Sequence, residues 1–158
     1  MRISIVVPML NEAAALPRLV ADLRALERQG AEVLLVDGGS QDGSAGLAAQ
    51  AGWRVLPAPR GRARQMNAGA AQATGEVLLF LHADTVLPEG ALAAVAAALR
   101  APGAVWGRFD VVIEGQHPML RVVAALMNRR SRWTGIATGD QAMFVTRETF
   151  DAVGGFPV

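Results

Sequence analysis

Three short apolar runs, each followed at once by polar residues, constrain the fold of this chain more than any other feature. The runs and the polar residues after them are 3–8 with Asn11 and Glu12, 33–36 with Asp37, and 79–81 with His82 and Asp84. In open α/β sheets, ligands bind in the crevice outside the carboxyl ends of the strands. The three runs therefore predict strands whose ends place polar side chains at one edge of a sheet.

Helical patterns separate these runs. Between the first two runs, apolar residues recur at helical spacing in one stripe, which comprises Leu16, Leu19, Val20, Leu23 and Leu26. The same reading along the chain predicts strands at residues 3–8, 32–37, 53–56, 76–81 and 105–113, and helices at 16–26, 42–50, 62–73, 90–99 and 117–132. This alternation predicts an α/β fold with a mostly parallel central sheet flanked by helices on both faces.

Composition favours one well-packed domain over residues 1–158. Hydrophobic residues make up 52% of the chain and charged residues 18%, and there is no cysteine. Any metal site must therefore use oxygen or imidazole ligands, and a reducing compartment is expected. The first strand begins too early to leave room for a signal peptide, and no apolar run reaches the ~18 residues that span a bilayer. We expect a cytoplasmic protein and no nucleic-acid partner, while the net charge of +1 is itself uninformative about partners.

The His82-Ala83-Asp84 sequence is the main candidate for metal binding. Mg²⁺ and Mn²⁺ commonly use one or two protein carboxylates and take their other ligands from water and substrate phosphates. Asp84 could therefore hold a divalent cation, with His82 as a second ligand or as a partner of a sugar hydroxyl. The alternative is a polar turn that ends a strand, with His82 as a structural hydrogen-bonding residue.

The two earlier strand ends offer contacts for a nucleoside. Asp37 precedes glycines that let a ligand approach the backbone, so its carboxylate could accept hydrogen bonds from a base or a ribose. Glu12 is a second candidate, although Asn11 and Glu12 could equally cap the helix that follows. Asp42 is expected to cap the next helix.

Two basic clusters suggest contacts with phosphate. Residues 60–65 combine three arginines with a predicted helix start, which suits a pyrophosphate, although a solvated basic turn is the alternative. The loop lacks the Walker pattern, and the first strand is not followed by Gly-x-Gly-x-x-Gly, so a P-loop enzyme and a dinucleotide dehydrogenase are disfavoured. The cluster from Arg129 to Trp133 could contact lipid headgroups or a phosphorylated acceptor, or could simply end a solvated helix.

With these residues in view, the chain resembles the family 2 glycosyltransferases, which have a GT-A type fold, over essentially its whole length. Residues 7–12 resemble the family's Val-Pro-x-x-Asn-Glu segment, residues 36–43 its Val-Asp-Asp-Gly-Ser-x-Asp-Gly segment, and residues 82–84 its Asp-x-Asp metal motif. The nucleotide-binding residues that the resemblance implies are Pro8, Leu10, Asn11, Glu12, Asp37, Arg62, Arg64 and His82. It also implies a divalent cation, Mn²⁺ or Mg²⁺, at Asp84, where His82 could be a further ligand. Gly139, Asp140 and Gln141 would lie in a loop that contacts the acceptor or the donor sugar.

The chain departs from the family pattern at three places. His82 replaces the first aspartate of the metal motif, and Gly38 replaces the second aspartate of the early acidic segment. In the family, a segment like Gly154-Gly155-Phe156 precedes a Glu-Asp pair that supplies the general base, whereas this sequence ends at Val158. We therefore expect a domain that lacks its C-terminal part, with Asp140 as the candidate base.

The implied reaction is an inverting transfer of a sugar from a nucleoside-diphosphate sugar to an unidentified acceptor. A second hypothesis is a non-catalytic or truncated module that binds a nucleotide sugar. A third is a sugar-nucleotidyltransferase, which usually has a Gly-rich basic loop after its first strand, whereas residues 8–12 have no such loop. In all three cases we allow peripheral contact with the inner face of the membrane through the segment from Arg129 to Trp133.

Overall fold

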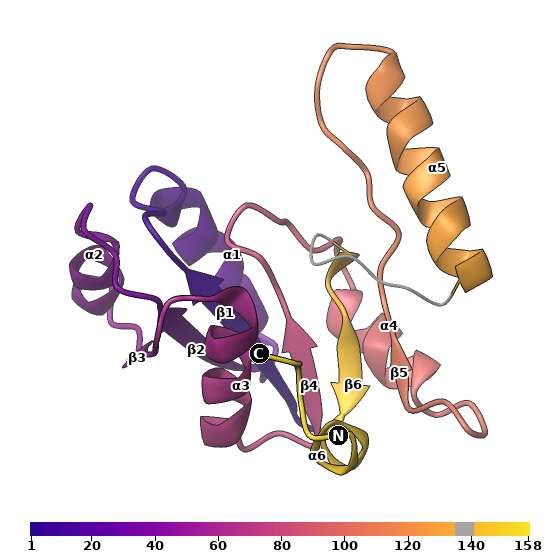
Figure 1. Cartoon of the computed structure of the whole chain (residues 1–158), viewed down its shortest axis with the longest axis horizontal. Coiled ribbons are helices and arrows are strands. Elements are labelled where there is room, and N and C mark those ends of the chain that lie inside the picture. The colour runs from indigo at the N-terminus through magenta and orange to yellow at the C-terminus, as the bar shows by residue number, and fades with distance from the viewer. Residues whose placement is uncertain (135–140) are drawn as a thin grey trace.

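A computed structural model describes residues 1–134 and 141–158 of the chain. Figure 1 shows a central sheet whose six strands lie in the order β3-β2-β1-β4-β6-β5. The strands are β1 (Ile3–Met9), β2 (Glu32–Asp37), β3 (Val55–Pro57), β4 (Val77–Phe80), β5 (Trp106–Gly107) and β6 (Phe144–Thr146). The helices are α1 (Leu16–Arg28), α2 (Ser44–Gln50), α3 (Arg62–Gln72), α4 (Ala91–Ala98), α5 (Met119–Thr134) and α6 (Arg147–Ala152). The predicted α/β fold is confirmed.

The sheet is parallel where the predicted site lies and antiparallel at its far edge. β1 pairs in parallel with β2 and β4, and β2 pairs in parallel with β3. β6 runs antiparallel to both β4 and β5. The carboxyl ends of β1, β2 and β4 therefore meet at one edge, with β1 between the other two.

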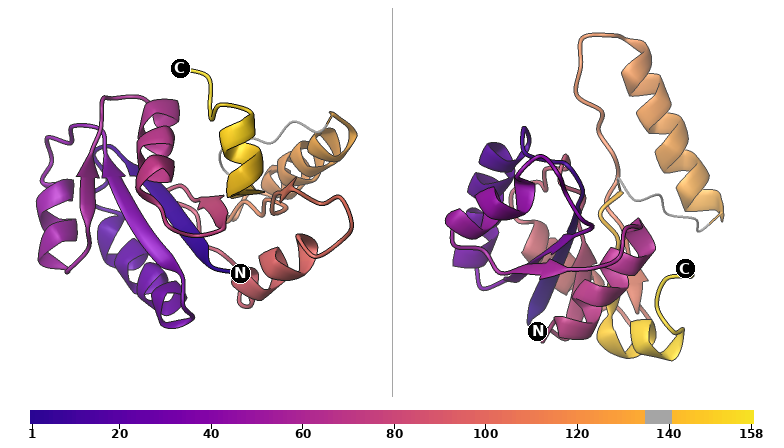
Figure 2. Two further views of the ribbon diagram at one scale, coloured as in Figure 1. Left: turned by 90° about the horizontal axis from the view of Figure 1, so that it is seen from below. Right: turned by 60° about the vertical axis from the view of Figure 1, so that its left-hand side comes forward.

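Helices cover both faces of this sheet, as the two views of Figure 2 show. Side chains of α1, α2 and α4 pack on one face, where Leu23 and Val95 are fully buried with Ile5. Side chains of α3 and α6 pack on the other face, where Ala70 and Phe150 join Val36. Every residue of β1 is buried, as expected for a central parallel strand covered on both sides.

One predicted element is wrong. Residues 105–113 were expected to form a long strand, but only Trp106–Gly107 pair with β6. Beyond them, the backbone of Val111 turns to the side chain of Asn128, which accepts from Val111 N at 2.8 Å and donates to Val111 O at 2.9 Å. Asn128 thus supplies the two hydrogen bonds that a neighbouring strand would have given, and the segment leaves the sheet.

Helix α5 stands out from the body of the molecule, as Figure 1 and the right-hand view of Figure 2 show. Among the side chains of α5, only Ala124 and Ser131 are buried. Within residues 1–134 and 141–158, no helix combines the length and the apolar character needed to cross a membrane.

Candidate functional site

A cavity of about 290 Å³ lies at the edge where β1 and β4 end. It combines residues from three separate strand-to-helix connections. The lining consists of Pro8, Met9, Leu10, Glu12, Arg60, Gly61, Arg62, Gln65, His82, Ala83 and Asp84. Six of the predicted site residues are therefore brought together here: Pro8, Leu10, Glu12, Arg62, His82 and Asp84.

The loop after β1 is fastened to the loop after β2. Asn11 Oδ1 accepts from Gln41 N at 2.8 Å, and Asn11 N donates to Ser40 Oγ at 2.9 Å. Next along the chain, Glu12 N donates to Ser44 Oγ at 2.8 Å. Asn11 adopts a left-handed conformation with φ of 56°, which asparagine tolerates better than most residues. These contacts fix the direction in which the backbone presents Glu12 to the cavity.

Asp42 connects the two loops, and it does not occupy the N-cap position of α2 that the sequence predicts for it. The N-cap position of α2 is Gly43, which makes no side-chain capping bond. The Asp42 carboxylate accepts from Ser44 N at 3.0 Å and from Ala13 N at 2.9 Å, so it joins both loops. Its bonds to Ser44 and Ala13 hold the pKa of Asp42 below its ordinary value.

Gln65, which the sequence analysis did not single out, closes the floor of the cavity. Its side chain is buried and donates to Met9 O at 2.7 Å and to Val36 O at 2.9 Å. These carbonyls lie at the ends of β1 and β2, so one amide group adds a second link between the two strands beside the backbone hydrogen bond from Gly38 N to Met9 O, which is 3.0 Å long. A Cβ atom at position 38 would lie 2.9 Å from Gln65 Cδ. Gly38, one of the departures from the family pattern, therefore makes room for Gln65.

The cavity is lined by charged side chains of both signs. Burial, followed by the negative charges of Asp84 and Asp42, raises the pKa of Glu12 above its ordinary value, and Arg62 offsets part of this effect. The carboxylates of Glu12 and Asp84 thus repel each other in a cavity that is also lined by Arg60 and Arg62, whose side chains are exposed. A cation beside the carboxylates and an anion beside the arginines would both be favoured.

The site suits a metal ion that takes most of its ligands from water and substrate phosphates rather than from the protein. In the part of the chain that the structure describes, no group of three His, Asp or Glu side chains could hold a metal ion. Asp84 is exposed and accepts a hydrogen bond from Thr85 Oγ1 at 3.3 Å, which leaves carboxylate lone pairs for a ligand. One carboxylate in such a setting fits Mg²⁺ or Mn²⁺ bound together with substrate phosphates.

The remaining predicted residues lie elsewhere. Asn11, Asp37 and Arg64 are not among the lining residues of this cavity. The Asp37 carboxylate accepts from Gly39 N at 3.0 Å and from Ser40 Oγ at 2.5 Å, within its own loop. Gln141 is buried and lines neither this cavity nor the second one described below, and its carbonyl accepts from Phe109 N at 2.8 Å. The predictions for Gly139 and Asp140 lie outside the described residues.

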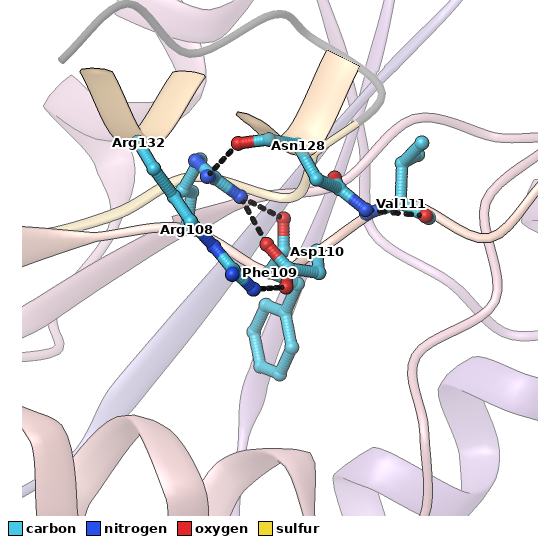
Figure 3. A network of polar contacts seen from close by, with 6 residues as sticks. All are labelled: Arg108, Phe109, Asp110, Val111, Asn128 and Arg132. Carbon is cyan, nitrogen blue, oxygen red and sulfur yellow. Dashed lines mark hydrogen bonds and ion pairs between the residues drawn. The ribbon is translucent and has the colours of Figure 1, made fainter. Parts of the chain in front are cut away.

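A second cavity, of about 550 Å³, adjoins the first at Asp84, which lines both. One of its walls follows β4 and includes Thr85 to Pro88. The other is the segment from Phe109 to Glu114. Figure 3 shows how side chains hold this second wall: Arg108 donates to Asp110 Oδ1 at 2.7 Å and to Asn128 O at 3.1 Å.

The fold and the position of the cavity define the class of protein. Strand order 3-2-1-4, with polar residues after β1, β2 and β4, is that of a doubly wound α/β domain, whose ligands bind at the carboxyl ends of the strands where the order reverses. The sequence matches "Glycosyl transferase family 2" over residues 4–156. The chain therefore belongs to glycosyl transferase family 2.

Curated relatives cover part of the chain. An uncharacterized glycosyltransferase, alr2836, of Nostoc is 38% identical over 93 residues, which are 54% of this chain and 29% of the relative. An uncharacterized glycosyltransferase, Mb0553, of Mycobacterium bovis is 34% identical over 98 residues, which are 61% of this chain and 43% of the relative. The chain thus spans less than half the length of these relatives.

Solved structures confirm the GT-A fold. A mannosyltransferase from Pyrobaculum calidifontis, in complex with GDP-Man and Mn²⁺, superposes with a TM-score of 0.76 at 24% identity, over 99% of this chain and 47% of that one. Glucosyl-3-phosphoglycerate synthase from Mycobacterium tuberculosis, with Mn²⁺, UDP-Glc and phosphoglyceric acid, gives 0.68 at 20% identity, over 93% of this chain and 57% of that one. At these identities, the likeness establishes the fold.

Proposed function

We propose that this domain transfers a sugar from a nucleoside-diphosphate sugar to an acceptor hydroxyl, with a divalent cation and with inversion at the anomeric carbon. The observation that carries the proposal is the first cavity, in which carboxylates from two loops face arginines at the start of α3. Membership of glycosyl transferase family 2 supports it. So do the nucleotide sugars and Mn²⁺ bound by the structural neighbours named above.

In this proposal, different residues of the cavity bind different parts of the sugar donor. Arg62 and Arg60 face the diphosphate, because guanidinium groups match phosphate oxygens and the first N–H groups of α3 lie beside them. Glu12 and the end of β1 hold the nucleoside. Asp84, with His82 beside it, would hold the cation, which lowers the charge that develops on the departing diphosphate.

The second cavity is the place for the acceptor in this proposal. It meets the first at Asp84, so a hydroxyl bound there lies next to the sugar carried by the diphosphate. A base must remove the hydroxyl proton, and Asp140 is the residue of this chain that we propose for that step.

Calorimetric titration of the protein with UDP, GDP and their sugars, with and without Mn²⁺, tests the nucleotide site. We expect binding that needs the cation and that falls by a factor on the order of 100 in Asp84→Ala, because the one carboxylate placed for the metal is gone. Glu89→Ala removes an exposed carboxylate that lines neither cavity and should bind as the wild type does.

Product analysis then separates the reactions that such a site could serve. Release of a nucleoside diphosphate supports glycosyl transfer, whereas release of pyrophosphate would identify a sugar-nucleotidyltransferase. Binding without any turnover, across a panel of acceptors, would identify a nucleotide-sugar-binding module. No binding with either base would refute the assignment of the cavity.

A further inference from the structure

Helix α5 presents an apolar face to solvent. Its exposed large apolar side chains are Met119, Val122, Val123, Leu126 and Trp133. Leu126 is 61% exposed and Trp133 is 75% exposed. Their spacing of three, four and seven residues places all five on one side of the helix. Within the described part of the chain, nothing covers this side.

The opposite side of α5 explains why the helix is held in this orientation. Ala124 and Ser131 are buried there, and Asn128 makes its two hydrogen bonds to Val111. Arg132 pairs with Asp110 at the end of the same side, as Figure 3 shows. The helix is therefore fixed by its polar side, and its apolar side is left outward.

The charge on α5 is of one sign. The helix has four arginines, Arg121, Arg129, Arg130 and Arg132, and neither Asp nor Glu. Arg132 is paired with Asp110, but among the described residues no carboxylate forms an ion pair with the other three. Arg129 lies at the border of the apolar face, Arg130 lies within the face towards the C-terminal end of the helix, and the Arg129 guanidinium stacks 4.4 Å from the centre of the Trp133 ring.

We propose that α5 lies flat on an anionic lipid bilayer, with its apolar face at the level of the headgroups and its arginines against the lipid phosphates. A tryptophan beside arginine at one end of an apolar face is typical of helices that lie in the membrane interface. The surplus of positive charge, with no carboxylate on the helix, favours an anionic surface over a second copy of this chain, which would bring four more arginines to the contact. The helix has 16 residues, too few to cross a bilayer.

This contact would set the position of the second cavity. Asp110 and Val111, which line that cavity, are the residues that Arg132 and Asn128 hold. The lipid surface and the cavity therefore share one short connection. The lipid contact does not depend on whether the first cavity binds a nucleotide.

Co-sedimentation with large unilamellar vesicles tests the proposal. We expect the protein to sediment with vesicles that contain phosphatidylglycerol, to remain in solution with pure phosphatidylcholine, and to be released by salt. Leu126→Glu and the double variant Arg129→Glu/Arg130→Glu should each weaken binding at least tenfold. Leu47→Glu is the matched control, because Leu47 is an exposed leucine on α2 and its replacement should leave binding unchanged.

Tryptophan fluorescence gives a second readout that does not depend on the charge of a variant. Trp133 emission should shift to shorter wavelength on anionic vesicles, and the shift should vanish in Trp133→Phe, which keeps Trp53 and Trp106. Failure to bind anionic vesicles would overturn the proposal. So would binding that Leu126→Glu leaves intact, or a dimer in light scattering that Leu126→Glu dissociates, since the face would then belong to a second copy.

Discussion

The first cavity is lined by residues at and just beyond the ends of strands, whereas one wall of the second is a segment held by side chains. In the first, the backbone of β1 and β2 is fixed by the sheet and by Gln65, and the loops above them bond to each other. In the second, Arg108 and Asn128 hold residues that have left the sheet. The first cavity therefore has a fixed frame, while the second can change through a few side chains without disturbing the core.

The largest effect should come from the helix that supports the first cavity. A Cβ atom on Gly69 would collide with Val6 Cγ1 and lie 2.9 Å from Val36 Cγ2, so α3 rests directly on β1 and β2. We expect Gly69→Val to destabilise the protein by about 3 kcal/mol, because it overpacks a core without spare room. Denaturant unfolding measures this loss. Gly46→Val is the control, since nothing lies within 4 Å of that position, and equal stability losses in the two variants would disprove the close packing.

A smaller loss is expected where Gly38 makes room for Gln65. Gly38→Asp should displace Gln65 and remove its two hydrogen bonds to the carbonyls of Met9 and Val36, at a cost of about 2 kcal/mol. In Gly38→Asp/Gln65→Ala the two losses should not add, because the second change removes the clash. Thermal unfolding of the two single variants and the double variant gives the coupling. Strict additivity would show that position 38 does not act through Gln65.

A substitution at Asn128 should loosen the wall of the second cavity without unfolding the rest of the domain. Asn128→Ala removes both hydrogen bonds to Val111, which we expect to cost about 1–2 kcal/mol of local stability. Amide hydrogen exchange should speed up at residues 108–113, while exchange in β1 and nucleotide binding at the first cavity stay unchanged. Gln116→Ala removes an exposed amide from the same connection and serves as the control. Faster exchange throughout β1 would mean that the two regions unfold together.

The smallest expected effect is a difference in how Tm depends on pH between variants of two carboxylates, Glu12 in the first cavity and Asp110 in the second. Burial and nearby carboxylates raise the pKa of Glu12, so its ionised form costs stability at neutral pH, and Glu12→Gln should raise Tm by about 1 °C. That gain should vanish as the pH falls below the ordinary value of 4.5. Arg108, followed by Arg132, lowers the pKa of Asp110 below its ordinary 3.8, so its stabilisation is present above that value and is lost as the pH falls through the lowered pKa. Asp110→Asn should therefore lower Tm slightly at neutral pH, and Tm profiles of equal sign for the two variants would contradict the assignment.

The parallel half of the sheet could be predicted from the sequence because each of its strands is marked by a local pattern. An apolar run followed by a polar turn identifies β1, β2 and β4, and their shared edge then predicts that Glu12, His82 and Asp84 meet. Arg62 could be predicted because it follows a Gly-containing break at the start of a helix.

The rest depended on contacts between distant residues. Residues 108–113 have the composition of a strand, but Asn128, 17 residues beyond Val111, takes up the backbone hydrogen bonds of that residue. Gln65 has the appearance of an ordinary polar helix residue, and only the packing of α3 shows that it is buried. Asp42 has the residue type of a helix cap, yet it lies one residue before the N-cap position, Gly43, and its carboxylate also accepts a backbone N–H from another loop.

Asp84 forms part of the boundary between two otherwise separate cavities, and this has a consequence for the design of inhibitors. A compound that chelates the cation proposed at Asp84 would lie next to both cavities, one towards Arg62 and one towards Phe109. Fragments selected separately for the two cavities could therefore be joined through that chelating group, and a short rigid junction would avoid the cost of a long flexible spacer.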